Sequence, residues 1–422
     1  MKKVVIIVDG YSTGRYFAKA FLKYSLVCWH IESQEKKPSN WNSQFLVEDY
    51  IGHSQWQNDF SRIQQSLPEH AEVVAVLAGS EPGVELADFL ADKFQVPGNP
   101  PATSLFRRNK AAMAQALRQA GVRAIADCVV ENPTQASNWL QQHPHYPVVV
   151  KPIDSAGTEG FHLCHDVTQV MKAVQMLLGR LNAFGKTNDQ ILLQEYIHGS
   201  EYIVNTVSLN GEHFFIEAWQ SNKQEIPGGR IYDREILLSP LDPIVKDKLL
   251  PYLRRALCAL DVQYGPCHSE LFIDDRGVVL IESGARLHGS ISPDAVRYAT
   301  GWSHLDAVTE LVADPQQFRL TAQRRESMPL PKFVFCVEHI AHKRGRVSGQ
   351  AMELIRQLPS YFMSQWVVAE NEEVDITRDL FSCLGNTYLM NDNWDYLEQD
   401  YQHLRQIERD YLIIPSDNPN HG

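Results

Sequence analysis

The sequence predicts an α/β (α+β) protein that begins with a doubly wound domain and continues into a mixed sheet. Residues 3–9, KVVIIVD, contain a continuous apolar run that is typical of a buried parallel strand. A glycine-bounded turn at residues 10–14 then leads into a helical pattern, as doubly wound domains begin. Residues 268–289 instead predict two neighbouring strands around a tight turn, and therefore antiparallel pairing in the central part of the chain.

The composition is that of a globular protein with several domains. The chain has 422 residues, of which 44% are hydrophobic and 21% are charged. Its net charge of −12 argues against a nucleic-acid partner or an anionic membrane surface. Seven scattered cysteines without a CxxC pair indicate neither a disulfide framework nor a zinc site. The N-terminus enters a strand directly and no apolar run has membrane-span length, so we expect a cytoplasmic protein.

The first 103 residues predict the doubly wound domain. Apolar runs at 25–31 and 73–78 predict further strands, and residues 84–94 predict a helix. The Gly-Asn-Pro-Pro sequence at 98–101 marks the end of this domain. An amphipathic helix over residues 104–120, which carries Lys110, is expected to follow.

A strand ending in Lys151 precedes a loop of small residues at 153–160. Backbone N–H groups of Gly, Ser and Thr crowd around phosphate oxygens, and a lysine supplies the counter-charge. The alternative is an ordinary strand end beside a loop, and these residues do not decide between the two. Residues 179–187 resemble a P-loop, but they have five residues between the glycines and follow a helical pattern, so we expect a helix exit and a polar loop there.

Two carboxylates flank a strand crossing further along. Glu195 ends a strand over residues 191–196, and Glu201 begins another over residues 202–209. A nucleotide could use backbone amides and a carboxylate at such a crossing, although a solvated strand end is an equal alternative. The polar, Gly-Pro-containing segment 220–236 predicts a mobile loop over a site. Its Arg230 is a candidate for substrate contact, with a solvated side chain as the stronger alternative.

The central hairpin carries the clearest chemical signal. Folding about residues 274–277 brings Glu270 and Glu282 nearly opposite each other on one face, inside otherwise apolar strands. Two carboxylates held that close repel unless a cation lies between them or one is protonated. Oxygen ligands on rigid strands suit Mg²⁺, which prefers one or two carboxylates together with substrate phosphates. Arg286, close after Glu282, can hold a carboxylate or a developing oxyanion; the alternative is a surface hairpin with solvated charges.

The order of these motifs resembles the ATP-grasp superfamily of carboxylate–amine ligases. Lys110, Lys151 with its small-residue loop, the QEYIxGxE crossing at 194–201 and the ExGxR sequence at 282–286 occur in that order. Within the superfamily the chain resembles the L-amino-acid ligases, the dipeptide-forming enzymes of the bacilysin and dapdiamide type. The resemblance extends over residues 104–315.

The resemblance implies an ATP-grasp fold and a division of the chain into four parts. These are an N-terminal domain, a small lid subdomain with a linker helix, a mixed-sheet catalytic core and a C-terminal α+β subdomain. Their expected ranges are 1–103, 104–190, 191–327 and 328–422. It also implies ATP and Mg²⁺, for which Mn²⁺ can substitute, small-molecule carboxylate and amine substrates, and a homodimer.

The resemblance also assigns roles to individual residues. ATP phosphates would contact Lys110 and Lys151, beneath a lid loop formed by Ser155, Ala156, Gly157 and Thr158; adenine would lie along Glu195, Tyr196 and Ile197, with the ribose at Glu201; Mg²⁺ would bind Glu270 and Glu282; Arg286 would steady the acyl phosphate or tetrahedral intermediate; and Arg230 and Gly289 are further candidates for substrate contact. One position departs from the pattern, because many members carry Asn where this chain has Gly284. Whether one or two metal ions bind is therefore open.

The implied activity is an ATP-dependent, ADP-forming ligation of a carboxylate and an amine through an acyl phosphate. One alternative is an ATP-grasp ligase or carboxylase of another pathway, with a nucleotide or bicarbonate-type acceptor, although no biotin-attachment domain is visible. Another is an ATP-binding protein that has lost catalysis. The intact Glu270, Glu282, Lys151 and Arg286 argue against this last alternative.

Overall fold

The computed structural model divides the chain into two compact units. It describes residues 2–34, 37, 45–153, 160–182, 187–226, 229–289 and 291–415. The first unit comprises residues 1–218, 239–294 and 302–329, and the second comprises residues 219–238, 295–301 and 330–422. The four-part division expected from the sequence remains a prediction.

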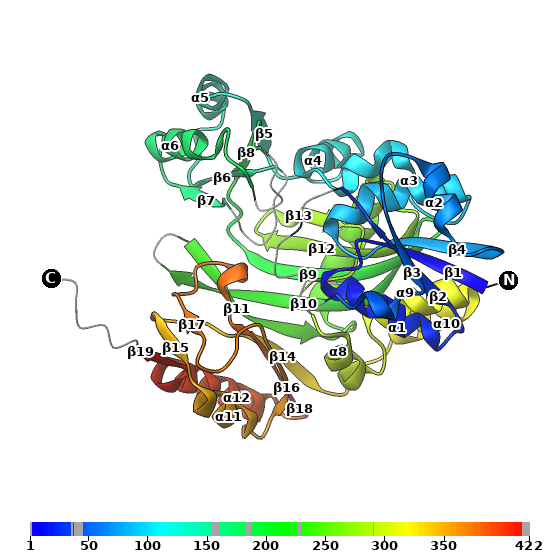
Figure 1. The fold of residues 1–422 in the computed structure, drawn as a ribbon. Helices are drawn as coiled ribbons and strands as arrows, with labels where there is room; N and C mark the ends of the chain where they lie inside the picture. The colour runs from blue at the N-terminus through cyan, green and yellow to red at the C-terminus, as the bar shows by residue number, and fades with distance from the viewer. Residues whose placement is uncertain are drawn as a thin grey trace. The chain divides into compact units, whose positions relative to one another are not determined.

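The first unit begins with a parallel four-stranded sheet in the order β3-β2-β1-β4. Its strands and helices are β1 (Lys2–Val8), α1 (Phe17–Leu22), β2 (Val27–Glu32), β3 (Gly52–Gln55), α2 (Phe60–Ser66), β4 (Ala71–Ala78) and α3 (Val84–Phe94). The predicted doubly wound start is therefore confirmed (Figure 1). Five consecutive residues of β1 are buried, because the strand pairs on both edges and is covered on both faces.

A second, smaller sheet in this unit has the order β5-β8-β6-β7 and is antiparallel. Its elements are β5 (Asp127–Val130), α5 (Pro133–Gln142), β6 (Val148–Pro152), β7 (His162–Cys164), α6 (Val167–Leu177) and β8 (Ile191–Glu195). Apolar residues of both helices and all four strands form one buried cluster. This sheet therefore has its own core and holds Lys151 on its middle strand β6.

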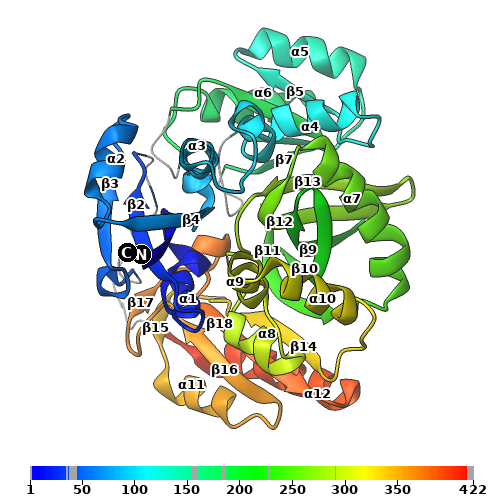
Figure 2. The ribbon, with the colours of Figure 1, turned by 90° about the vertical axis from the view of Figure 1, so that its right-hand side faces the viewer.

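The mixed core of the first unit contains the predicted hairpin. Its elements are α4 (Lys110–Gln119), β9 (Ser200–Leu209), the start of β10 (Glu212–Ile226), α7 (Leu250–Ala259), β12 (Tyr264–Asp274), β13 (Gly277–Gly284), α9 (His304–Ala313) and α10 (Pro315–Arg325). Strand β12 pairs antiparallel with both β9 and β13. Figure 2 shows these three strands beside one another, with α7 packed near β13.

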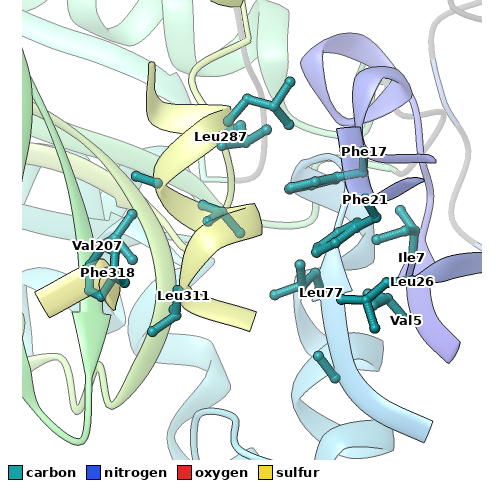
Figure 3. Packing of buried hydrophobic residues seen from close by; sticks show 14 of the residues in the cluster. Val5, Ile7, Phe17, Phe21, Leu26, Leu77, Val207, Leu287, Leu311 and Phe318 are labelled. Atoms are coloured by element: carbon teal, nitrogen blue, oxygen red, sulfur yellow. The ribbon is translucent and has the colours of Figure 1, made fainter. Parts of the chain in front are cut away.

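One hydrophobic cluster joins the N-terminal sheet to the mixed core within the first unit. Phe17, Phe21 and Leu77 of the N-terminal sheet layer belong to the same buried cluster as Leu311 and Phe318. Figure 3 shows side chains of this cluster on both groups of elements, with Phe17, Phe21 and Leu77 on one and Leu311 and Phe318 on the other. Burial of large apolar side chains contributes about 1.5–3 kcal/mol each, so this cluster fixes the N-terminal sheet against the hairpin.

The second unit contains two antiparallel sheets, one of which is packed against helices. It contains the end of β10 and then β11 (Gly229–Leu238), most of α8 (Pro293–Thr300), β14 (Phe333–Glu338), β15 (Gly345–Val347), α11 (Gly349–Arg356), β16 (Tyr361–Trp366), β17 (Glu373–Val374), β18 (Gly385–Asn391), α12 (Trp394–Ile407) and β19 (Ile413–Pro415). The order β11-β14-β18-β16 is set by antiparallel ladders. Residues from β14, β18, α11 and α12 form its core.

The prediction of a mobile loop at residues 220–236 is wrong. Most of the segment belongs to β10 and β11. Composition suggested a loop because the segment is polar, but Ile231 and Asp233 are buried while Tyr232 and Arg234 are more exposed, which is strand alternation. Asp233 is buried because Arg405 and Tyr401 satisfy its carboxylate, and both partners lie far away in the sequence.

The prediction of a single helix over residues 104–120 is also wrong for its first residues. Residues 101–107 form a 3₁₀ helix, and α4 begins only at Lys110. Asn109 interrupts the pattern because its side chain accepts hydrogen bonds from the backbone N–H groups of Ala111 and Ala112. Lys110 is consequently the first residue of a helix.

One further element was not anticipated from the sequence. Helix α10 was not expected, although Asp314 caps it and Pro315 begins it. Across the described residues, no helix is both long enough and apolar enough to cross a membrane.

Candidate active site

The register of the β12–β13 hairpin places Glu270 directly opposite Glu282. Antiparallel partners point to the same face, so the two carboxylates share one face of the sheet, as expected from the sequence. The register shifts between Glu270 and Leu271, which is a bulge next to the pair. Both side chains are partly accessible, with 22% of Glu270 and 26% of Glu282 exposed.

Lys110 lies against this pair from the start of α4. Its Nζ atom is 2.7 Å from Oε2 of Glu282. Burial by itself would raise the pKa of Glu282, but the charges of Lys110, Lys151 and Arg286 outweigh it and lower the pKa to about 2. Lys151, on β6, therefore lies close enough to act on Glu282, and both predicted phosphate lysines converge on the glutamate pair.

Arg286 is held by a residue that the sequence did not indicate. Its Nε donates to Oε2 of Glu81 at 2.8 Å, and its Nη1 donates to the carbonyl of Leu287 at 2.9 Å. The other oxygen of Glu81 accepts from Nη1 of Arg108 at 3.0 Å. Burial alone would raise the pKa of Glu81, but the charges of Arg286 and Arg108 lower it. Glu81 is therefore an anion between two guanidinium groups.

A row of buried polar side chains lies beside Glu270. Nδ1 of His268 is 3.0 Å from Oδ1 of Asn205, whose Nδ2 donates to Glu217 at 2.7 Å. Nδ2 of Asn205 also lies 3.3 Å from Nδ1 of His288, and the rings of His268 and His288 stack at 4.2 Å. Because Glu217 accepts from the amide nitrogen, the amide oxygen faces His268 and fixes its hydrogen on Nδ1.

The two imidazoles in this row are held neutral. Burial lowers the pKa of His268 to about 3 and lowers the pKa of His288 well below its usual value, and Arg286 adds to both effects. Nε2 of His268 lies 3.4 Å from Oε1 of Glu270. The site thus places two neutral imidazoles beside the carboxylate pair.

The residues expected at the nucleotide lie around the β8–β9 crossing. Glu195 already accepts from the backbone N–H of Ala126 at 3.0 Å and pairs with Arg276 at 3.0 Å. Ile197 is buried in a small apolar cluster, and Glu201 is buried on β9. Tyr196 packs edge-on against the ring of His198. The structure places all four candidates together, and their contacts with ATP remain predictions.

The remaining candidates lie elsewhere or outside the description. Ser155, Ala156, Gly157 and Thr158 are outside the described residues, as are parts of the polar loop expected around residues 182–189 and of the C-terminal segment. Arg230 belongs to the second unit, where its Nη2 lies 3.2 Å from Glu225. The carbonyl of Gly289 accepts from Ser12 at 3.0 Å and from Thr13 at 2.9 Å, so its contact is with the 3₁₀ helix that follows β1.

The donor set fits a divalent cation that also binds phosphate. Two facing carboxylates supply hard oxygen ligands, and the lysines and Arg286 supply positive charge for phosphate oxygens. Among the residues that the structure describes, no group of three His, Cys, Asp or Glu side chains is arranged to hold a metal alone. Phosphate oxygens would therefore complete the coordination, as Mg²⁺ sites in ATP-using enzymes commonly require.

Sequence reasoning missed Glu81, Arg108, Asn205, His268 and Glu217. Asn205, Glu217 and His268 are polar residues inside apolar strands, which is the signal that identified Glu270 and Glu282. The same signal would have selected Asn205 and His268 on their strands. It would not have selected Glu81, because a glutamate in a Gly-Ser-Glu-Pro-Gly turn is expected to be solvated.

Comparison with known sequences gives a family match and matches to curated relatives. Residues 144–294 match the ATP-grasp domain family. The chain is 30% identical to dapdiamide A synthase of Enterobacter agglomerans over 98% of this chain and 97% of that protein. It is 26% identical to a D-alanine–D-alanine ligase of Halalkalibacterium halodurans over 36% of this chain and 47% of the ligase.

Solved structures agree in fold. The L-amino acid ligase from Bacillus licheniformis has a TM-score of 0.74 at 17% identity, with 99% of both chains covered. A carboxyaminoimidazole ribonucleotide synthase from Aspergillus clavatus, complexed with ATP, has a TM-score of 0.70 at 15% identity, with 97% of this chain and 98% of that chain covered. These likenesses show the fold, whereas the full-length sequence match shows kinship. The chain belongs to the ATP-grasp superfamily of carboxylate–amine ligases.

Proposed function

We propose that this ligase joins the carboxylate of an amino acid, or of another small acid, to the amine of a second amino acid. ATP is converted to ADP and phosphate in the process. The observation that carries the proposal is the convergence of Glu270, Glu282, Lys110 and Arg286 on one face of the hairpin. The full-length likeness to dapdiamide A synthase supports an amide-forming reaction of this kind.

In the first step, a substrate carboxylate oxygen attacks the γ-phosphorus of ATP, and the bond to the ADP oxygen breaks. Lys110 and Lys151 would hold the phosphate oxygens, and Glu270 and Glu282 would hold the metal. Bound Mg²⁺ would neutralise charge on the transferred phosphoryl group. The step is one of positioning and charge neutralisation, so it needs no nucleophilic side chain.

In the second step, the amine attacks the acyl carbon and phosphate leaves. Negative charge develops on the carbonyl oxygen, and the guanidinium of Arg286 is the group we assign to it. Water would hydrolyse the acyl phosphate, so the site must exclude it. The family resemblance assigns that task to residues 155–158, the expected lid loop.

The deciding experiment is phosphate release from Mg·ATP over a matrix of paired amino acids and small carboxylic acids, with mass spectrometry of products. We expect phosphate together with one condensed amide. A product containing carbonate or a nucleotide acceptor would replace the proposal with another ligase activity. ATP binding without phosphate release over the whole matrix would contradict it in favour of an inactive ATP-binding protein.

A homodimer remains a prediction of the resemblance. Light scattering coupled to size-exclusion chromatography tests it directly. A monomeric mass of 48.0 kDa would contradict the prediction.

A further inference from the structure

The face of the hairpin that carries the two glutamates has a gap at Gly284. Asn205, His268 and Gly284 are cross-strand partners in one row across β9, β12 and β13, next to the row that contains Glu270 and Glu282. Gly284 alone contributes no side chain to these rows. Its backbone is not in the left-handed region, so conformational freedom does not explain the glycine.

The carboxylate of Glu81 occupies this gap. A Cβ atom added to Gly284 would lie 2.5 Å from Oε2 of Glu81 and 3.4 Å from Nε of Arg286. The first separation is far inside van der Waals contact, so any side chain at position 284 must displace the Glu81 carboxylate.

Glu81 has little freedom to move away. Both of its oxygens accept hydrogen bonds, from Arg286 at 2.8 Å and from Arg108 at 3.0 Å. Its turn directly follows β4, and Ser80 donates to the carbonyl of Asp9 at 2.8 Å. Displacing the carboxylate would therefore break its bond to Arg286.

We propose that Glu81 is the positioning residue of Arg286, and that residue 284 is glycine because the Glu81 carboxylate fills the space of its side chain. The role of Arg286 in the reaction rests on the proposed function. Glu81 engages Nε, and the Leu287 carbonyl engages Nη1. Within the described part of the chain these two contacts leave Nη2 of Arg286 as the nitrogen that we assign to the substrate.

The inference also explains why the chain departs from the superfamily pattern at this position. The site has a carboxylate from the N-terminal sheet where an Asn side chain would extend from the hairpin. That carboxylate is committed to two guanidinium groups, which makes it a support for Arg286 and not a metal ligand.

A double-mutant cycle between Glu81→Ala and Gly284→Ala tests this arrangement. Each single variant is expected to lower kcat about 100-fold because Arg286 is misplaced, while the KM for ATP stays within about threefold. The double variant is expected to be no worse than Glu81→Ala, because the added methyl group then meets no carboxylate. Gly284→Ala should lower Tm in the parent but not in the Glu81→Ala background.

Glu85→Ala is the matched control, because Glu85 also lies near Arg108, at 3.9 Å, but is exposed. Its effect should be small and should combine independently with Gly284→Ala. Glu81→Gln keeps the shape, so Gly284→Ala should still lower Tm in that background.

Two results would overturn the inference: independent, multiplying effects of Glu81→Ala and Gly284→Ala, or a Gly284→Ala protein that behaves like the parent. The Tm measurements test the contact between the Glu81 carboxylate and a side chain at position 284, even if the parent turns over no substrate pair. Absence of turnover would then count against the proposed function alone.

Discussion

The two units each contain a cluster of buried charges, and the clusters differ in what they leave open. In the first unit, Lys110 and Glu282 form an ion pair whose members are 11% and 26% exposed. In the second unit, Arg405 pairs with Asp233 at 2.6 Å and with Glu408, and the Arg405 and Glu408 side chains are at most 3% exposed. Asp233 is 12% exposed, so the carboxylates of the first cluster are more accessible than those of the second.

Most polar atoms of the second cluster, which we call the closed cluster, are paired by hydrogen bonds within it, although Nε of Arg405 is not. Arg405 also donates to the carbonyl of Glu338 at 2.8 Å, and Tyr401 donates to Asp233 at 2.7 Å. Glu408 lies 2.7 Å from Nδ1 of His339. His339 reaches Thr387 through Nε2 at 2.8 Å and stacks on Trp366.

The difference indicates that the charges of the second cluster stabilise the fold, whereas those of the first cluster are available to a ligand. The closed cluster ties β11 and β14 to α12, and its carboxylates are less accessible than Glu270 and Glu282. The open cluster places two like charges opposite each other and balances them with lysines that a phosphate would also attract. We therefore expect substitutions in the first cluster to affect activity and substitutions in the second to affect stability.

The largest expected effect is that of Glu282→Gln. The variant keeps the shape of the side chain but loses a metal ligand, so kcat should fall by about 10³-fold with little change in Tm. Steady-state phosphate release and calorimetry measure the two quantities. Glu326→Gln, which changes a partly exposed partner of Arg254, is the matched control and should change neither kcat nor Tm. Full activity in Glu282→Gln would remove this residue from the metal site.

Arg405→Met should give the opposite pattern in the second unit. Removing the guanidinium leaves Asp233 and Glu408 buried without their cation, which typically costs about 3–5 kcal/mol of unfolding free energy. Denaturant unfolding measures this loss. Arg409→Met, on an exposed neighbouring position, should change stability by less than about 0.5 kcal/mol. A stable Arg405→Met protein would show that the closed cluster is not structural.

Lys151→Ala should weaken ATP binding specifically. One charge-assisted contact to phosphate contributes about 1.5–3 kcal/mol, so the KM for ATP should rise roughly 10- to 100-fold, more than kcat falls. Lys172→Ala, on α6 of the same small sheet, is the control. An unchanged ATP dependence in Lys151→Ala would separate that lysine from the phosphates.

The sequence anticipated the parts of the site that depend on local pattern. The facing of Glu270 and Glu282 follows from a tight turn and a period of two, so their register could be derived without coordinates. Lys151 could be placed at a strand end for the same reason. The fold class was also accessible, because the apolar run of β1 and the central hairpin are strong local signals.

The parts that were missed depend on contacts between distant segments. Glu81 meets Arg286 across 205 positions of the sequence, and Asp233 meets Arg405 across 172. Nothing in the local pattern shows that a turn glutamate will be buried, or that a polar segment will be a buried strand. Both errors have one cause, which is that burial of a charge is decided by its partner.

The last prediction concerns the pH dependence of Glu338, which differs from the carboxylates of the first cluster. Burial is the main cause that raises its pKa to about 7, against a hydrogen bond to Asn386 and the charge of Arg405. The pKa of the folded state is thus above the ordinary value of 4.5, and the folded state binds more protons between these two pH values. Stability should therefore fall as the pH rises from about 4.5 to about 7, by at most ~1.4 kcal/mol per pH unit.

Glu338→Gln isolates this contribution, because glutamine cannot ionise. Its unfolding free energy relative to the parent should increase steadily across that pH window and stay level below it. Denaturant unfolding at intervals of pH measures the difference, and Glu353→Gln on the exposed face of α11 is the control. If the unfolding free energies of the Glu338→Gln variant and the parent depend on pH in the same way, the pKa of Glu338 is not raised in the folded protein. Glu338 would then be an anion in the folded second unit, as Glu282 is in the first.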